Sequence, residues 1–129
     1  MTRPIALVAD DCRTLRVITA RYLDSLGFDS IVVANAQDAF EEAMLRPFNL
    51  IITDLRLPDD DGENLITRIL SHCDLNRQTP YLFISAEEQD TLKQRNIPVD
   101  RFIKKPIDET NFAQHVQAAV FAHPNSSAH

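Results

Sequence analysis

The segment FNLIITD, residues 48–54, is a mainly apolar run whose last residue, Asp54, carries a carboxylate. A carboxylate at the end of a buried strand is costly unless something pairs with it. Three other apolar runs also end in reactive polar side chains. Asp10 and Asp11 follow IALVA (5–9), Ser85 follows YLFI (81–84), and Lys105 follows FIK (102–104). We therefore expect the ends of four strands to converge on one pocket.

Short β-branched runs alternate along the chain with segments of helical spacing. The expected strands lie near residues 5–9, 30–33, 49–53, 80–84 and 101–104. Strands that alternate with helices predict a parallel sheet with helices on both faces. Five strands of this length fit the α/β, flavodoxin-like order 2-1-3-4-5, in which ligands bind at the carboxyl ends of strands 1 and 3. Those two strands carry Asp10, Asp11 and Asp54, so the fold and the residues indicate the same edge.

The segments between the expected strands have apolar faces with helical spacing. These faces are Leu15, Ile18, Tyr22 and Leu26; Ala36, Phe40, Ala43 and Met44; Leu65, Ile66, Ile69, Leu70 and Cys73; and Phe112, Val116, Ala119 and Val120. We expect Gly27 to end the first helix, and Asn35 and Asp108 to cap the second and the last. The polar segment 87–96 predicts a short, loosely held helix, because Leu92 is its only large apolar residue.

The run DDDG at residues 59–62 has the composition of a calcium-binding loop. An EF-hand is excluded, because Leu57 and Arg68 would occupy the first and last ligand positions. We interpret the run as a solvated turn in which Asp60 or Asp61 caps the next helix.

The chain has 129 residues, of which 13 are basic and 19 acidic, so its net charge is −6. This charge argues against direct nucleic-acid binding, which draws its affinity from neutralised phosphates. No apolar stretch approaches the ~18 residues that span a bilayer, so we expect no membrane contact. We expect one domain over residues 1–122, a disordered tail over 123–129, and reduced thiols at Cys12 and Cys73 in a cytoplasmic protein.

Three carboxylates in one pocket repel one another unless a cation lies among them. With no clustered histidine or cysteine, the oxygen ligands favour Mg²⁺, with Mn²⁺ as the second choice. The charge of Lys105 and the hydroxyl of Ser85 would then counter charge on phosphoryl oxygens. In such a pocket Asp54 can act as a nucleophile and form an aspartyl phosphate.

Helix capping is the competing explanation for these polar residues. Asp11 or Ser85 alone is as consistent with an N-cap as with a site residue, and a lone lysine is usually a solvated surface charge. The joint pattern argues for a site, because Lys105 also follows a strand and lysine cannot cap a helix N-terminus.

The sequence as a whole resembles a response-regulator receiver domain of two-component signalling, of the CheY-like type. The motifs that carry the resemblance are Asp10-Asp11, Asp54 with Leu57-Pro58 and Asp61-Gly62 downstream, Ser85-Ala86, and Lys105-Pro106. The resemblance covers roughly residues 4–121. It implies a phosphoacceptor signalling domain, not an enzyme that acts on an external substrate.

The resemblance also implies a role for each site residue. Asp54 would accept a phosphoryl group from a histidine kinase or a histidine phosphotransfer protein, and Lys105 would pair with Asp54 and then with the phosphoryl oxygens. Mg²⁺ would be bound by Asp11, Asp54 and the backbone carbonyl of Arg56, and by Asp10 through water. Ser85 and Phe102 would form the switch, which alters the face of helix 4, strand 5 and helix 5 toward a downstream partner that the sequence does not identify.

Two other functions remain as alternatives. The first is a receiver-like interaction module that works without phosphorylation. The second is a phosphatase with an aspartyl-phosphate intermediate, of the haloacid-dehalogenase type. That family places a second aspartate two residues after the nucleophile, and here the position is Arg56, which argues against it.

Overall fold

The computed structural model describes residues 2–87 and 94–122 of the chain. The strands are β1 (Ile5–Ala9), β2 (Asp29–Val33), β3 (Leu50–Asp54), β4 (Tyr81–Ser85) and β5 (Phe102–Lys104). The α-helices are α1 (Arg13–Ser25), α2 (Ala36–Leu45), α3 (Gly62–His72) and α5 (Glu109–Ala122), and the short 3₁₀ helices are η1 (Asp74–Asn76) and η2 (Val99–Arg101). The expected helix over 87–96 falls largely on residues 88–93, and the expected tail is 123–129; both lie outside the described residues.

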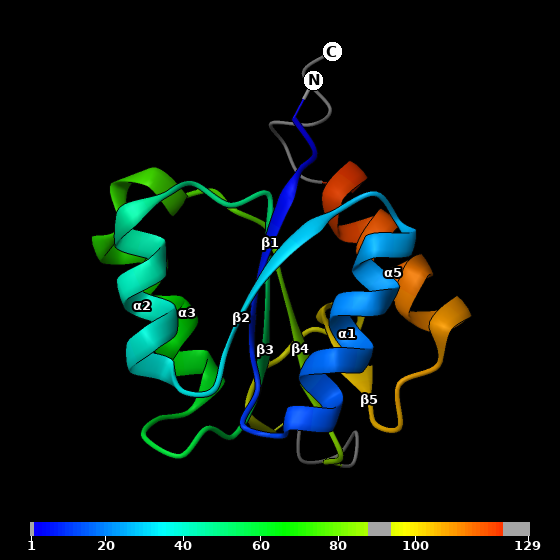
Figure 1. Ribbon diagram of the computed structural model, residues 1–129. Coiled ribbons are helices and arrows are strands. Elements are labelled where there is room, and N and C mark those ends of the chain that lie inside the picture. The colour runs from blue at the N-terminus through cyan, green and yellow to red at the C-terminus, as the bar shows by residue number, and fades with distance from the viewer. Residues whose placement is uncertain (1, 88–93, 123–129) are drawn as a thin grey trace.

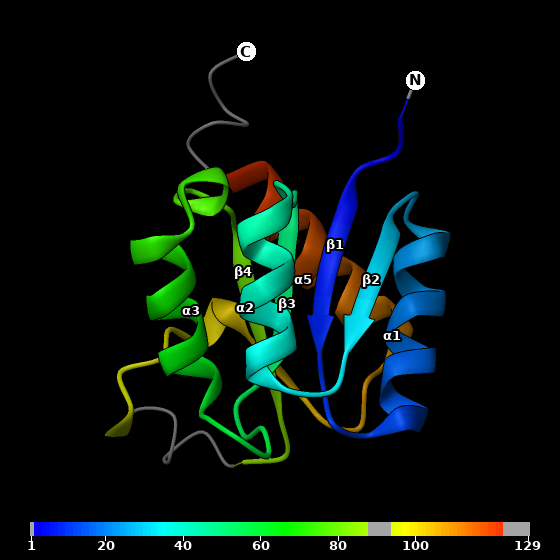
Figure 2. The ribbon, with the colours of Figure 1, turned by 60° about the vertical axis from the view of Figure 1, so that its left-hand side comes forward.

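The strands form one parallel sheet in the order β2-β1-β3-β4-β5. Helices α1 and α5 cover one face of the sheet, and α2 and α3 cover the other (Figure 1). Figure 2, a turned view, shows β2 at the edge of the sheet beside α1. This is the predicted α/β, flavodoxin-like fold. It follows from the alternation of strands and helices, because each parallel pair needs a crossover that packs back on the sheet.

The sheet separates two hydrophobic cores. On the side of α2 and α3, Leu7 and Ile51 pack with Leu65 and other residues of α3. On the side of α1 and α5, the next residues along the strands, Val8 and Ile52, form the second core. Because its side chains alternate between two covered faces, β3 is buried at all five positions. Its sequence is therefore apolar without alternation from Leu50 to Ile52, before it ends in Thr53 and Asp54.

The predicted apolar faces hold for α3 and α5 but differ for the other two helices. In α1 the buried residues are Thr19 and Leu23, while the four predicted residues are half-buried. The reason is position, since α1 packs against β1 and β2 at the edge of the sheet, where one side of the helix has no neighbour. In α2 the stripe against the sheet is Ala36, Ala39 and Ala43, and Met44 is 51% exposed.

The helix ends follow the predicted capping residues with one exception. Gly27 ends α1 with φ +90°, a left-handed conformation that glycine adopts without strain. Asn35 Oδ1 accepts from the Asp38 N–H at 2.8 Å, and Asp108 Oδ2 accepts from the Asn111 N–H at 2.8 Å. Asp61 occupies the N-cap position of α3, but its side chain makes no capping hydrogen bond.

Asp59 adds a second cap to α2, a contact that the sequence did not indicate. Its two carboxylate oxygens accept from the backbone N–H groups of Ala36 (2.8 Å) and Gln37 (2.9 Å) at the start of α2. The Ala36 hydrogen bond is the main reason that the pKa of Asp59 lies below its usual value. The DDDG run is therefore more than a solvated turn, because it joins the β3–α3 loop to α2.

Asn76 is a fully buried polar residue that joins three segments at the end of the sheet where β3 and β4 begin. Its Oδ1 accepts from the Phe48 N–H at 2.8 Å and from the Thr79 hydroxyl at 2.9 Å. Its Nδ2 donates to the carbonyls of Ala43 (2.8 Å) and Arg46 (2.9 Å), which are the end of α2. These bonds satisfy backbone groups that would otherwise be buried without partners.

The structure also bears on membrane contact. Within residues 2–87 and 94–122, none of the helices has both the length and the apolar character that crossing a bilayer requires.

Candidate functional site

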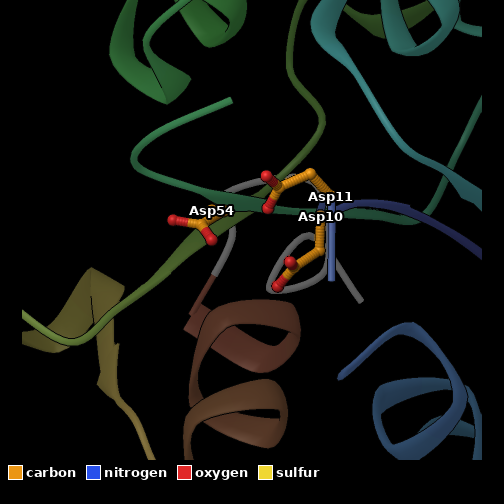
Figure 3. Close-up of side chains that lie close together, drawn as sticks. All are labelled: Asp10, Asp11 and Asp54. Atoms are coloured by element: carbon orange, nitrogen blue, oxygen red, sulfur yellow. The ribbon is translucent and has the colours of Figure 1, made fainter. Parts of the chain in front are cut away.

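The three aspartates predicted as one cluster do meet at the carboxyl edge of the sheet. Asp10 and Asp11 follow β1, Asp54 ends the neighbouring strand β3, and one carboxylate oxygen from each lies within 4.8 Å of the others. Figure 3 shows the three side chains at this edge. Asp10 and Asp54 are 2% and 8% exposed, whereas Asp11 is exposed. The floor of the pocket therefore holds two buried carboxylates, and the third carboxylate lies at its mouth.

Lys105 reaches the same pocket from β5. Its Nζ donates to Asp54 Oδ2 at 2.7 Å and lies 3.7 Å from Asp10 Oδ2. Burial alone would lower the pKa of Lys105, but the hydrogen bond to Asp54 and the charges of Asp10 and Asp54 outweigh it, so the pKa is raised. The ammonium therefore stays charged at neutral pH. The backbone holds it there, because the Lys105 N–H donates to the Ser85 carbonyl at 2.9 Å.

One carboxylate oxygen of Asp10 accepts no hydrogen bond from residues 2–87 and 94–122. Its Oδ1 accepts from the Cys12 N–H at 2.9 Å, whereas its Oδ2 is buried without such a partner within these ranges. Burial is the main cause that raises the pKa of Asp10 above its usual value. A buried carboxylate oxygen that accepts no hydrogen bond, beside two further carboxylates, is suited to a divalent cation or to its bound water. The oxygen-only donor set fits Mg²⁺ or Mn²⁺.

Asp54 is held on both carboxylate oxygens. Oδ1 accepts from the Arg56 N–H at 3.0 Å, and Oδ2 accepts from Lys105. Behind it the chain turns tightly into α3, where the Gly62 N–H donates to the Leu55 carbonyl at 2.8 Å. A Cβ atom on Gly62 would lie 2.4 Å from the Asp54 carbonyl oxygen. Only glycine fits there, so the loop fixes the backbone of Asp54.

Ser85 lies at this edge on β4, and Phe102 lies in the core on the next strand, β5. The β3–β4 register pairs Asp54 with Ile84, so Ser85 comes one residue later at the same edge. Its Oγ accepts from the Glu87 N–H at 3.0 Å, and the residue is 3% exposed. Phe102 is 6% exposed and is paired with Phe83 on β4. The switch roles of Ser85 and Phe102 stay predictions.

An ion-pair network that the sequence did not indicate borders the pocket. Arg56 Nε pairs with Glu87 Oε1 at 2.6 Å, and Glu87 also accepts from Arg95 Nη1 at 2.9 and 3.0 Å. Arg95 in turn pairs with Glu63 of α3. Burial would raise the pKa of Glu87, but the hydrogen bonds from Arg95 and Arg56 lower it overall. The network ties the segment after β4 to the first turn of α3.

The geometry agrees with a family assignment. The family model of the response regulator receiver domain matches residues 6–117, which is most of the chain. The chain therefore belongs to the response regulator receiver domain family, and the resemblance inferred from its motifs is confirmed.

Relatives and solved structures are consistent with this assignment. The transcriptional regulatory protein SrrA of Staphylococcus aureus is 29% identical over 114 residues, which cover 87% of this chain and 46% of SrrA. The chain thus spans about half the length of that relative. A sensor protein from Polaromonas sp. JS666 is 29% identical with a TM-score of 0.81, over 95% of this chain and 99% of that one.

A second solved structure has the same fold at lower identity. The receiver domain of the sensor histidine kinase PA1611 from Pseudomonas aeruginosa is 21% identical, with a TM-score of 0.80 over 92% of this chain and 98% of that one.

Proposed function

We propose that this chain is the phospho-accepting receiver of a two-component phosphorelay, and that Asp54 takes a phosphoryl group from a phosphohistidine donor. The observation that carries the proposal is the pairing of Asp54 with the Lys105 ammonium at 2.7 Å, inside a pocket that holds two more carboxylates. A structural salt bridge would need only one carboxylate. Two further acids with an unsatisfied oxygen indicate a pocket built for additional positive charge.

The residues suited to hold Mg²⁺, or Mn²⁺ in its place, are Asp11, Asp54 and the backbone carbonyl of Arg56, with Asp10 acting through a water molecule. The unsatisfied Oδ2 of Asp10 supports this assignment. So does the related receiver domain of PA1611, which is described with a magnesium ion coordinated in its active-site cleft. A bound divalent ion supplies positive charge that offsets repulsion between the carboxylates and an incoming phosphoryl group.

In the transfer, an oxygen of Asp54 forms a bond to phosphorus while the bond between phosphorus and the donor imidazole nitrogen breaks. The Arg56 N–H orients the carboxylate through Oδ1. Lys105, which already contacts Oδ2, is close enough to pair with the phosphoryl oxygens as they arrive. The reaction consumes one donor for each protein molecule, so the domain is a signalling acceptor and not an enzyme with an external substrate.

The response to phosphorylation would begin at Ser85. Its hydroxyl now accepts from the Glu87 N–H, and it would leave this partner to donate to a phosphoryl oxygen. Phe102, on the next strand, would move into the space that Ser85 vacates. We propose that the face of β5 and α5, together with segment 87–96, carries this change to a downstream protein.

The chain fits a single receiver domain over residues 1–122 that acts in the cytoplasm. Its partners would be a histidine kinase or a histidine phosphotransfer protein and a protein target, with no direct contact to nucleic acid or membrane. The net charge of −6 supports the exclusion of nucleic acid.

Intact-mass spectrometry tests the proposal. The protein is incubated with a small acyl phosphate, such as acetyl phosphate, in Mg²⁺ and in EDTA. We expect one phosphoryl group on the wild-type protein in Mg²⁺ and little in EDTA, and none on Asp54→Asn. An unmodified wild-type protein, or an equal adduct on Asp54→Asn, would overturn the assignment.

A further inference from the structure

A surface groove lies between α1 and the edge strand β2, and the proposed phosphotransfer does not use it. The groove has a volume of about 480 Å³. Val17, Ala20 and Val32 form its apolar lining, and Arg13, Arg16 and Arg21 form its basic lining. We call it the α1–β2 groove. Figure 2 shows the two elements that flank it, side by side at the edge of the sheet.

The apolar lining is exposed because, in the described part of the chain, α1 covers this edge of the sheet only in part. The inward side chains of β2, Ile31 and Val33, pack in the core under α2. Val32 therefore points to the opposite face, where it meets α1 but stays 42% exposed, and Val17 of α1 is 48% exposed. Single exposed valines are ordinary. Two of them line one hollow, and Ala20, one turn after Val17 on α1, adds to an apolar surface that a partner can bury.

The charge of the groove is opposite to that of the whole chain. Three guanidinium groups line it, although the net charge is −6. Its one acidic residue, Asp24, is already paired with Arg3 at 3.0 Å. Among residues 2–87 and 94–122, neither Arg13 nor Arg21 has a carboxylate within ion-pair distance. These two cations are therefore available to an anionic ligand, and arginine pairs with carboxylates in a two-pronged geometry.

Arg16 is the third cation, and it has a second contact. Its Nη1 donates to the backbone carbonyl of Asp10 at 2.8 Å. It therefore presents a fixed charge to the groove, unlike a mobile surface arginine. A ligand that pairs with it would lie one side chain away from the acidic pocket.

We infer that the α1–β2 groove binds an acidic amphipathic helix of a partner protein. Small apolar side chains of that helix lie against Val17, Ala20 and Val32, and carboxylates on either side of its apolar stripe pair with Arg13 and Arg21. The length suits such a ligand, because α1 has 13 residues and thus offers about 20 Å of groove wall, enough for three to four turns of a second helix. Phosphorylation of Asp54 is not required for this contact.

Two other anionic ligands fit the observations less well. A nucleic-acid backbone would leave the valine lining unburied, and the net charge of −6 opposes its approach. A second copy of this chain would have to bring an acidic apolar helix to the groove. Helix α2 exposes the apolar residues Met44 and Leu45. A second copy is therefore the alternative ligand that the test must distinguish from a partner protein.

The test begins with a displayed library of 16-residue helical peptides, selected on the wild-type protein and counter-selected on the double variant Val17→Asp, Arg21→Glu. Both side chains are exposed, so the double variant retains its fold, which its amide spectrum verifies. We expect the surviving peptides to carry Asp and Glu on both sides of an apolar stripe. A pool that is neutral or basic, or a pool that binds both proteins equally, overturns the inference.

The best peptide is then titrated into isotopically labelled protein. We expect shifts in the amides of Val17, Ala20 and Val32, at least tenfold weaker binding to Arg13→Glu, and unchanged binding to Arg77→Glu, an exposed arginine that does not line the groove. Shifts centred on another surface overturn the inference. Sedimentation without peptide tests for a dimer. A concentration-dependent dimer that Val17→Asp abolishes would also overturn the inference, because the groove would then bind a second copy of the chain.

Phosphorylation gives an independent control. Because Val17 lies outside the acidic pocket, Val17→Asp should form the Asp54 adduct as the wild-type protein does. Loss of the peptide with an intact adduct therefore separates this inference from the proposed function. If Val17→Asp also fails to form the adduct, the groove is not independent of the phosphorylation site, and the inference is overturned.

Discussion

Gly62→Ala is expected to damage the phosphoacceptor site without touching any of its reactive side chains. The two glycines of the chain serve different purposes. Gly62 lets the β3–α3 loop approach the backbone of Asp54, whereas Gly27 supplies the left-handed conformation at the end of α1. Replacing each by alanine separates a steric effect at the pocket from a general loss of stability.

The size of the effect follows from the contact distances. A Cβ on residue 62 would lie 2.4 Å from the Asp54 carbonyl oxygen and 3.2 Å from both the Asp54 carbonyl carbon and the Leu55 Cα. All three atoms are backbone, so no side chain can rotate away. Restoring even 3.0 Å requires a backbone shift of about 0.6 Å, from 2.4 to 3.0 Å. Overpacking of this kind destabilises by about 1–3 kcal/mol, and the displaced carboxylate lowers the phosphorylation rate roughly tenfold.

Gly27→Ala is the matched control. Its Cβ would meet no atom within 4 Å, but its φ of +90° is unfavourable for alanine, at about 1–2 kcal/mol. Urea unfolding measures the stability of both variants, and the rate of adduct formation from acetyl phosphate in Mg²⁺ measures the site. We expect both variants to lose stability and only Gly62→Ala to lose rate. Equal rates for the two variants and the wild-type protein would refute the idea that the glycine fixes Asp54.

Three further predictions concern stability and are each measured by urea unfolding. Asn76→Ala should lower the free energy of unfolding by about 3–4 kcal/mol, because it removes four hydrogen bonds, three of them buried and one part-buried. A loss under about 1 kcal/mol would contradict this role. Asp59→Ala should lose about 1 kcal/mol at pH 7. The difference should shrink as pH falls below 3.8, because a carboxyl group with a lowered pKa stabilises above its unfolded pKa and loses this effect as pH falls through the folded pKa. A difference that does not decrease at all below pH 3.8 would refute the capping assignment. Arg95→Met should lose about 1–2 kcal/mol, because part-buried Glu87 is left with fewer hydrogen-bond partners. Arg77→Met breaks an exposed ion pair and should lose less than about 0.5 kcal/mol. Equal losses would show that the network adds no more stability than an exposed ion pair.

The fold was accessible from the sequence because its signals are local and periodic. A strand buried on both faces lacks the apolar–polar alternation of a half-exposed strand, so the apolar runs within IALVA (5–9) and FNLIITD (48–54) are recognisable. The structure moves the strand limits by about one residue. The site was accessible for a related reason. Parallel strands end at the same edge, so reactive residues that follow them must gather there. Asp10, Asp11, Asp54 and Lys105 do so.

The rest depends on contacts between residues far apart in the chain. Asp59 caps a helix that starts 23 residues earlier, and Arg95 pairs with Glu63 across 32 residues. No period or motif relates such partners, because opposite charges are common on any surface. The face of α1 was misjudged for a similar reason. A helix at the edge of a sheet buries a narrower stripe than its apolar spacing indicates, because the spacing of a helix does not record how many neighbours cover it.

The structure gathers three carboxylates beside Lys105, and the central claim is that the three carboxylates share one divalent ion at Asp54. Mn²⁺ scatters anomalously and is an accepted substitute for Mg²⁺ in oxygen-ligand sites, so crystals soaked in Mn²⁺ give the most direct test. We expect one anomalous peak, roughly 2.0–2.2 Å from carboxylate oxygens of Asp11 and Asp54 and from the Arg56 carbonyl oxygen, that is lost in Asp54→Asn. A saturating soak with no peak among the three acids, or a peak only at another acidic surface, would contradict the claim.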